Sequence, residues 1–176
     1  VTKYASELFS ILKSKQIKLN LLCIRPFNTF GPFQSEKAII PEIILKCLQN
    51  KDIRTTEGKQ TREFNYIENI IDGIIFLDKK IKHSDEPINI GSNKPISIKN
   101  LVKKIHEYSN SSSKLKIGDL KYRPNEIWKM QANNKFITSK GWKPKKDFNT
   151  GLRETISWYK NFYKIYLSKK GTFKNL

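Results

Sequence analysis

The stretch RPFNTFGPFQ, residues 25–34, follows a strand-like apolar run, LNLLCI, at residues 19–24. It holds two prolines, one glycine and three phenylalanines but only one charged residue. Because loops normally run over the surface, an apolar loop of this kind is expected to be buried or to cover something. Asn28 lies in its middle, and a buried amide must find hydrogen-bond partners in the backbone or in a ligand. The residues alone leave both alternatives open.

Helix-like and strand-like segments alternate around this stretch. Helices are expected over residues 2–16, 38–50, 68–81, 98–108, 133–140 and 149–166, and extended segments over 19–25, 53–56, 62–66 and 87–91. Residues 95–97 are expected to start the fourth helix, with Ser97 as its N-cap. Apolar residues at helical spacing predict the helices, and short runs bounded by turns predict the strands. The alternation predicts the α/β class.

Two of these helices carry an apolar face. In helix 2–16 it consists of Ala5, Leu8, Phe9, Ile11 and Leu12. In helix 68–81 it consists of Ile70, Ile71, Ile74, Ile75 and Leu77. The chain starts with Val1 inside the first helix, and its only methionine is Met130. We therefore expect a fragment whose N-terminal part is missing.

The charge of the chain is strongly basic. Thirty-four Lys and Arg residues against sixteen Asp and Glu residues leave a formal net charge of +18, which invites a nucleic-acid hypothesis. The lysines are scattered, however, with no dense block and no zinc-finger spacing, so nucleic-acid binding is disfavoured. An anionic small substrate explains a basic pocket equally well.

The cysteines and the hydropathy bear on metal binding, membrane spans and the cellular location. Cys23 and Cys47 lie in apolar stretches with no His or Cys at ligand spacing, so we interpret them as buried free thiols and expect no metal site. No apolar run approaches the ~20 residues that a membrane span needs, so no membrane partner is expected. A reducing, cytoplasmic location fits this pattern.

Arginine is scarce, and two arginines stand at the ends of elements. Arg62 lies in TREFNY between a turn and an aromatic segment, and Arg123 precedes a proline in YRPNE. A guanidinium suits bidentate binding of a diphosphate, while a surface ion pair is the alternative for each. Lys3 precedes Glu7 by one helical turn, and an exposed ion pair between them is the simplest interpretation.

Seven short motifs occur in a fixed order. They read RPFNTFGP at residues 25–32, IP at 40–41, GKQTREFNYI at 58–67, NIG at 89–91, RPNE at 123–126, GWKP at 141–144 and GLRETISWY at 151–159. This order resembles the C-terminal part of the extended short-chain dehydrogenases/reductases that act on nucleotide sugars, nearest to the UDP-N-acetylglucosamine 4,6-dehydratase-like branch. The resemblance implies a Rossmann-type α/β fold with a small mixed α/β substrate-binding subdomain. Residues 1–35 would end the Rossmann core, and residues 36–176 would mainly form the subdomain.

The resemblance assigns roles on the cofactor side. Lys3 matches the active-site lysine, which holds the nicotinamide ribose and lowers the pKa of a catalytic tyrosine. Pro26 lies where the backbone passes the nicotinamide. That tyrosine would stand four residues before Lys3, outside the sequence, as would the glycine-rich dinucleotide loop and the tyrosine's Ser/Thr partner. The expected cofactor is NAD, with NADP as the alternative.

The resemblance also assigns roles on the substrate side. Asn28 matches a substrate-contacting asparagine, Arg62 and Arg123 match arginines that grip the diphosphate, and Glu126 matches an acidic residue at the ribose of the nucleotide. Arg25 is expected to be structural. Asn69 stands where the family usually has Asp.

The implied parent protein is an enzyme that binds a nucleotide-diphosphate sugar. As a 4,6-dehydratase or an epimerase, it would oxidise the sugar at C4 in bacterial surface-polysaccharide or amino-sugar synthesis; a reductase of 4-keto sugars is a further alternative. The family commonly forms homodimers through the Tyr-Lys helix. The present chain alone is expected to be inactive. The alternative from another class is a non-catalytic module that binds a sugar nucleotide or nucleic acid through its basic surface.

Overall fold

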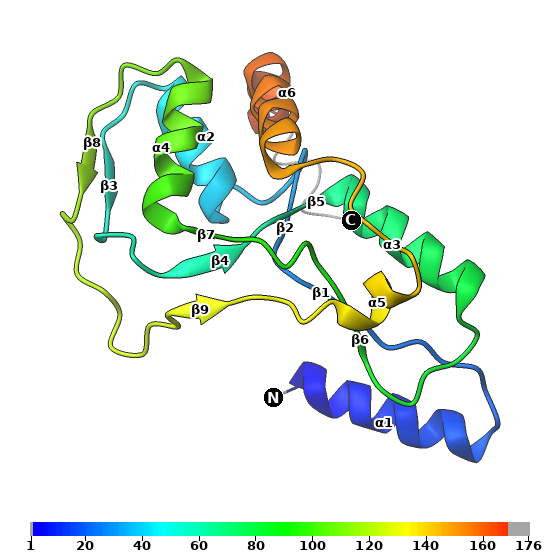
Figure 1. The fold of residues 1–176 in the computed structure, drawn as a ribbon. Helices are drawn as coiled ribbons and strands as arrows, with labels where there is room; N and C mark the ends of the chain where they lie inside the picture. The colour runs from blue at the N-terminus through cyan, green and yellow to red at the C-terminus, as the bar shows by residue number, and fades with distance from the viewer. Residues whose placement is uncertain (1, 169–176) are drawn as a thin grey trace.

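The computed structural model describes residues 2–168 as a mixed α/β arrangement (Figure 1). Its elements are α1 (Thr2–Gln16), β1 (Ile24–Pro26), β2 (Thr29–Phe30), α2 (Ile39–Leu48), β3 (Ile53–Thr55), β4 (Thr61–Glu63), β5 (Asn65–Tyr66), α3 (Ile67–Lys80), β6 (Ile88–Ile90), β7 (Pro95–Ser97), α4 (Ile98–Ser109), β8 (Leu115–Ile117), β9 (Lys129–Met130), α5 (Lys135–Ser139) and α6 (Phe148–Ser168).

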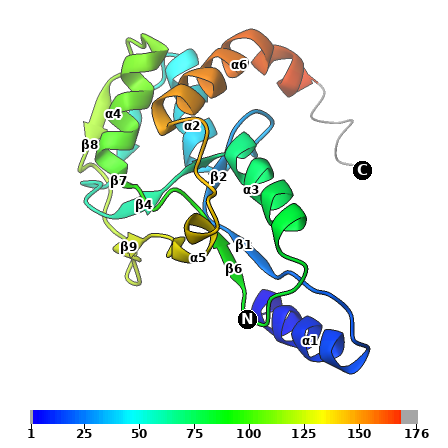
Figure 2. The same cartoon turned by 45° about the vertical axis from the view of Figure 1, so that its right-hand side comes forward.

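A parallel pair of strands, β1 and β6, lies between α1 and α3. Its register runs from Ile24 opposite Ile88 to Pro26 opposite Ile90, and both views place α1 below the pair and α3 above it (Figures 1 and 2). Ile70 and Leu77 of α3 are buried in the same apolar cluster as the β6 isoleucines. Parallel pairing with helices on both faces is typical of a Rossmann-type sheet.

Arg25 joins α1 to this pair of strands. Its Nε donates to Glu7 Oε2 at 2.8 Å, and this hydrogen bond holds the pKa of the Glu7 carboxyl below its ordinary value. Arg25 is therefore structural, as expected. The expected Lys3–Glu7 ion pair was wrong, because the Glu7 carboxylate binds Arg25 instead.

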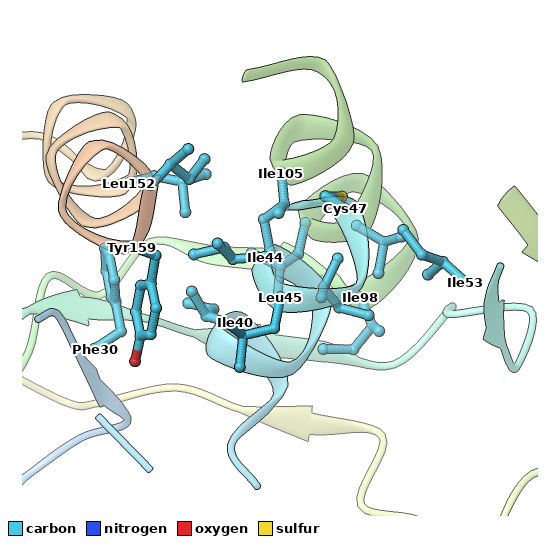
Figure 3. Packing of buried hydrophobic residues seen from close by; sticks show 14 of the residues in the cluster. Phe30, Ile40, Ile44, Leu45, Cys47, Ile53, Ile98, Ile105, Leu152 and Tyr159 are labelled. Atoms are coloured by element: carbon cyan, nitrogen blue, oxygen red, sulfur yellow. The ribbon is translucent and has the colours of Figure 1, made fainter. Parts of the chain in front are cut away.

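The larger core lies between α2, α4 and α6 (Figure 3). Ile44 of α2, Ile105 of α4 and Leu152 of α6 are completely buried there. Phe30 and Tyr159 close the side of this core that faces the apolar loop, and the Tyr159 hydroxyl donates to the Gln34 carbonyl at 2.7 Å. The apolar loop is thus anchored to the last helix.

Short strands connect the two cores. β4 lies between β7, which is antiparallel to it, and β9, which is parallel. β2 pairs with β5, and β3 pairs with β8. The chain passes from β1 through β2 to α2, continues through β3, β4 and β5 to α3, and reaches α4 from β6 through β7.

Most predicted elements are confirmed, and the errors have physical causes. The strand expected over 19–25 begins only at Ile24, and residues 115–117 form an unforeseen strand. Residues 95–97 are the strand β7 rather than a helix start, although Ser97 does cap α4 by accepting from Asn100 N at 3.2 Å. Short strands are fixed by their partners, which local sequence does not specify.

The two apolar helix faces are only partly buried. In α3, Ile70 and Leu77 are buried, but Ile71, Ile74 and Ile75 are 40–48% exposed. In α1, Leu8, Phe9 and Leu12 are 49–67% exposed. Both helices form as predicted, but most of the apolar side chains assigned to the face of each helix are not covered by residues 2–168.

Cys23 and Cys47 are both free thiols; Cys47 is buried and Cys23 is partly buried. None of the helices within residues 2–168 combines the length and apolar character needed to cross a bilayer.

Asn69 is buried and both ends of its side-chain amide are hydrogen-bonded, since Nδ2 donates to Lys146 O and Oδ1 accepts from Lys145 N. An aspartate could not make the first of these bonds.

We predict that Gly151→Ala destabilises the chain. A Cβ at Gly151 would lie 2.6 Å from Cγ of the buried Tyr66 ring, and this overlap should outweigh the gain of about 1 kcal/mol in helix propensity. The expected loss in free energy of unfolding is about 1–3 kcal/mol, measured by urea denaturation. Ser157→Ala, at an exposed site of the same helix, is the control and should be neutral or slightly stabilising. Equal stability of Gly151→Ala and wild type would contradict this packing.

We predict that the cap of α6 makes a pH-dependent contribution. Asp147 accepts from Thr150 N at 2.9 Å, and hydrogen bonds from Thr150 hold its pKa below the ordinary value of 3.8. The folded-state pKa is thus the lower one, so the stabilisation is present above pH 3.8 and is lost as the pH falls through the folded pKa. Asp147→Ala should cost about 0.5–2 kcal/mol at pH 7 and less at pH 3. Asp147→Asn keeps an acceptor, so a cost as large as that of Ala would argue against the cap.

Candidate functional site

A cavity of about 680 Å³ lies beside the apolar loop. Its walls come from the loop after β1, from α2, from the segment β3–β4 and from the chain between β8 and β9 (Figure 1). The lining residues are Asn28, Thr29, Gln34, Ala38, Ile39, Ile40, Glu42, Ile43, Arg54, Thr55, Thr56, Gln60, Arg62, Phe64, Ile98, Leu120, Lys121, Arg123 and Glu126. All four residues predicted for the substrate side are therefore brought to one cavity from three distant parts of the chain.

The alternation of an extended strand explains how β4 serves this cavity. Gln60, Arg62 and Phe64 all line it, whereas Glu63 and Asn65 are buried away from solvent. Successive side chains of a strand point to opposite faces, so one set reaches the cavity and the other set reaches the interior. Residues 60–65 thus supply both side chains that line the cavity and side chains that are buried behind it.

Arg62 and Glu126 form an ion pair inside the cavity. Arg62 Nη2 donates to Glu126 Oε1 at 2.8 Å, and the two side chains are only 14% and 15% exposed. Arg62 Nη1 also donates to the carbonyl of Thr61 at 2.8 Å. The guanidinium is therefore held in a defined position at the cavity wall.

Further basic side chains stand near this pair. Arg123 and Lys121 are exposed residues of the cavity wall, and the turn that carries Arg123 is closed by a hydrogen bond from Glu126 N to Arg123 O at 3.2 Å. Arg54 lines the cavity from β3 and pairs with Asp119. The cavity wall holds four cationic side chains and two carboxylates, those of Glu42 and Glu126, so its net charge is positive. A positive wall favours an anionic ligand.

The side chain of Asn28 does not brace its own loop. Among the described residues, the one hydrogen-bond partner of its Nδ2 is the thioether of Met130, at 3.5 Å, which is a weak acceptor. The loop is held instead by Asn65, whose backbone N–H donates to Asn28 O and whose Nδ2 donates to Phe27 O. The amide of Asn28 is thus left for the cavity that it lines.

Two glutamines of the cavity were missed by the sequence analysis. The Oε1 atoms of Gln34 and Gln60 are buried and have no hydrogen-bond partner within the described part of the chain, although both residues line the cavity. A buried acceptor without a partner costs free energy. The signal for Gln60 was its spacing of two residues before Arg62, on the same side of an extended strand.

Known proteins match the chain over this fold. A family model described as the NAD dependent epimerase/dehydratase family matches residues 1–91. The chain belongs to this family. A CDP-abequose synthase from Salmonella muenchen is 27% identical over 152 residues, which cover 86% of the chain and 52% of the relative. A dTDP-D-glucose 4,6-dehydratase from Homo sapiens is 29% identical, with 92% of the chain and 48% of the relative covered.

Solved structures agree with this assignment. The UDP-N-acetylglucosamine 4-epimerase of Methanobrevibacter ruminantium M1, in complex with UDP-N-acetylmuramic acid, superposes with a TM-score of 0.81 at 28% identity, covering 90% of the chain and 52% of that protein. The UDP-glucuronic acid 4-epimerase of Bacillus cereus, in complex with UDP-glucuronic acid and NAD, gives 0.81 at 25% identity, covering 92% and 52%. The chain thus spans about half the length of the relatives it matches.

In this member of the epimerase/dehydratase family, the two residues expected on the cofactor side lie outside the cavity. Lys3 is exposed one helical turn before Glu7, and Pro26 follows Arg25 at the end of β1. Arg25, the residue before Pro26, binds Glu7, which follows Lys3 by one helical turn. No cluster of three or more metal-ligating side chains occurs among the described residues.

We predict that the Arg62–Glu126 pair stabilises the fold measurably. Glu126→Gln removes the charge from a hydrogen bond that is largely shielded from solvent, so the free energy of unfolding at pH 7 should fall by about 1–2 kcal/mol. Glu42→Gln is the matched control, because its pair with Lys46 is 32–45% exposed and should contribute at most about 0.5 kcal/mol. Urea denaturation of both variants tests this difference. Equal losses in the two variants would refute it.

Proposed function

We propose that the cavity binds the nucleotide-diphosphate part of a nucleotide sugar, and that the whole protein is an NAD-dependent nucleotide-sugar dehydratase or epimerase. The observation that carries the proposal is the convergence of Asn28, Arg62, Arg123 and Glu126 on one cavity. The bound UDP-sugars of the related epimerases support this substrate class. The relatives' length supports a missing dinucleotide-binding part, to which residues 1–35 would attach as the end of the Rossmann core, with residues 36–176 mainly forming the substrate-binding subdomain.

The cavity suggests how the ligand would be oriented. Arg62 and Arg123 would bind the diphosphate, since planar guanidinium groups match phosphate oxygens. Arg54 and Thr55 line the β3 side, and Asn28 lines the β1 side, with β4 between β3 and β1 in Figure 1. The nucleoside would lie toward β3 and the sugar toward Asn28, next to the end of the α1–β1 layer. Glu126, bound to Arg62, would contact the ribose or give way to the diphosphate.

On the cofactor side, Lys3 and Pro26 fit a nicotinamide nucleotide. The exposed ammonium of Lys3 and the exposed end of β1 at Pro26 lie at one end of a parallel strand pair, which is where such folds bind dinucleotides. Bound NAD would supply hydride acceptance at the sugar C4. Lys3 would hold the nicotinamide ribose through its N–H donors, and its positive charge would lower the pKa of a nearby phenol. The apolar loop would exclude water from the sugar.

The exposed apolar face of α1 supports a further part of the proposal. Leu8, Phe9 and Leu12 are each about half exposed or more, and apolar helix faces of this kind mark interaction surfaces. In the whole protein this face would be covered by the dinucleotide-binding part or by the same helix of a second copy in a homodimer.

We predict that Arg62→Ala weakens the binding of UDP, measured by isothermal titration calorimetry. Loss of charge-assisted hydrogen bonds to the diphosphate should cost about 1.5–3 kcal/mol, which corresponds to roughly a 10- to 150-fold higher Kd. Arg153→Ala is the matched control, because Arg153 stacks on the ring of Tyr108 at 3.7 Å and does not line the cavity.

The same titration separates the alternative function. If the chain is a nucleic-acid binding module, duplex DNA should bind more tightly than UDP, with an affinity that falls steeply as salt rises. The proposal requires the opposite: UDP binding that depends on Arg62, and weak DNA binding. UDP binding that is unchanged in Arg62→Ala would overturn the phosphate assignment.

A further inference from the structure

We infer that Asn65, held by the buried carboxylate of Glu63, is a positioning residue that sets Asn28 at the sugar end of the cavity. This inference rests on the proposed function, because Asn65, outside the cavity, would position Asn28, which lines the cavity and would contact the sugar. Neither Glu63 nor Asn65 lines the cavity, and both are buried polar side chains. A buried polar network needs an explanation because every member must be satisfied.

Asn65 connects the ends of β1 and β6 through its backbone N–H and through both the Nδ2 and the Oδ1 of its side chain. Its backbone N–H donates to Asn28 O at 2.9 Å, and its Nδ2 donates to Phe27 O at 3.0 Å. Its Oδ1 accepts from Ser92 N at 2.8 Å. Phe27 and Asn28 directly follow β1, and Ser92 follows the end of β6. Asn65 therefore lies where the chain leaves both parallel strands.

Glu63 fixes the orientation of that amide. It is fully buried; its Oε1 accepts from Asn65 Nδ2 at 3.0 Å, and its Oε2 accepts from Ala132 N at 2.7 Å. Only a glycine leaves room for this carboxylate, because a Cβ at Gly91 would lie 2.0 Å from Glu63 Oε1. With Nδ2 committed to Glu63 and Phe27 O, the oxygen of the Asn65 amide must face Ser92.

The position of Asn28 depends on this network more than on its own side chain. Within the described part of the chain, the Asn28 amide makes one weak hydrogen bond, to Met130, so its place in the cavity follows from the backbone of residues 27–28. The network meets that backbone on the interior face of the β4–β5 strand, whereas Arg62 lies on the opposite, cavity face. A change at Asn65 should therefore disturb the sugar end and leave the diphosphate end unchanged.

Substitutions can separate this task from a merely structural one. Asn65→Asp places a second carboxylate beside Glu63 and removes the donor to Phe27 O. Glu63→Gln/Asn65→Asp restores the contact between the two side chains with reversed polarity, because the Gln amide can donate to the Asp carboxylate. The donor to Phe27 O stays absent in the double variant. Thermal unfolding should therefore recover toward wild type in the double variant, while the position of Asn28 should not.

Calorimetry with UDP and with UDP-N-acetylglucosamine reads out the sugar end. We expect the double variant to bind UDP with a Kd within about 2-fold of wild type. Its Kd for UDP-N-acetylglucosamine should rise roughly 3- to 10-fold, because the displaced Asn28 would lose one hydrogen bond to the sugar. Parallel weakening of both ligands would reveal a general structural role and overturn the inference. Full recovery of sugar binding together with stability would also overturn it.

A measurement without ligand keeps this test independent of the proposed function. In ¹⁵N-labelled protein, the double variant should shift the amide resonances of residues 27–29 and leave the Arg62 side-chain Nε–H resonance unchanged. If wild type binds no UDP, the proposed function fails, while these resonances still decide whether Asn65 positions the loop. Unchanged resonances at residues 27–29 would refute the positioning role even if UDP binds.

Discussion

The alternation of side chains along the segment from Gln60 to Asn65 is the constraint on which the cavity depends. A strand has two faces, and here one face carries Gln60, Arg62 and Phe64 into the cavity while the other sends Glu63 and Asn65 into the interior. The interior pair reaches the apolar loop after β1 and the segment after β9. Arg62 lines the cavity only while Glu63 points into the interior, because a one-residue change in register would exchange their faces.

Burying a carboxylate completely costs free energy, and the carboxylate of Glu63 nevertheless joins several segments of the fold. Glu63 is tolerated because two N–H groups donate to it and because Gly91 leaves it space; without those donors its burial would be strongly unfavourable. An apolar residue could fill the same volume, but it could not orient the Asn65 amide. The network therefore specifies one arrangement of the strand ends beside the cavity.

Much of this organisation could be predicted from the sequence, and the limits follow from physics. Helix periods and the Ser97 cap are local signals, so α1, α2, α3, α4 and α6 were predicted within a few residues of their bounds. The strand β8 and the late start of β1 were not predicted, because a three-residue strand exists only through its partner. The Lys3–Glu7 pair failed for a similar reason: helical spacing makes it possible, but Arg25 from β1 competes more effectively for Glu7.

The sequence by itself determined the order of motifs, the α/β class and the residue types able to bind an anion, because these are properties of composition and spacing. It could not decide whether Asn28 braces its loop or contacts a ligand. The tertiary structure shows that Asn28 lines a cavity and that Asn65, more than thirty positions away, holds the loop in its place; contact of Asn28 with a ligand stays a prediction. The direct pairing of Arg62 with Glu126 was equally beyond the sequence, because contacts between distant segments depend on how strands and helices pack rather than on any local pattern.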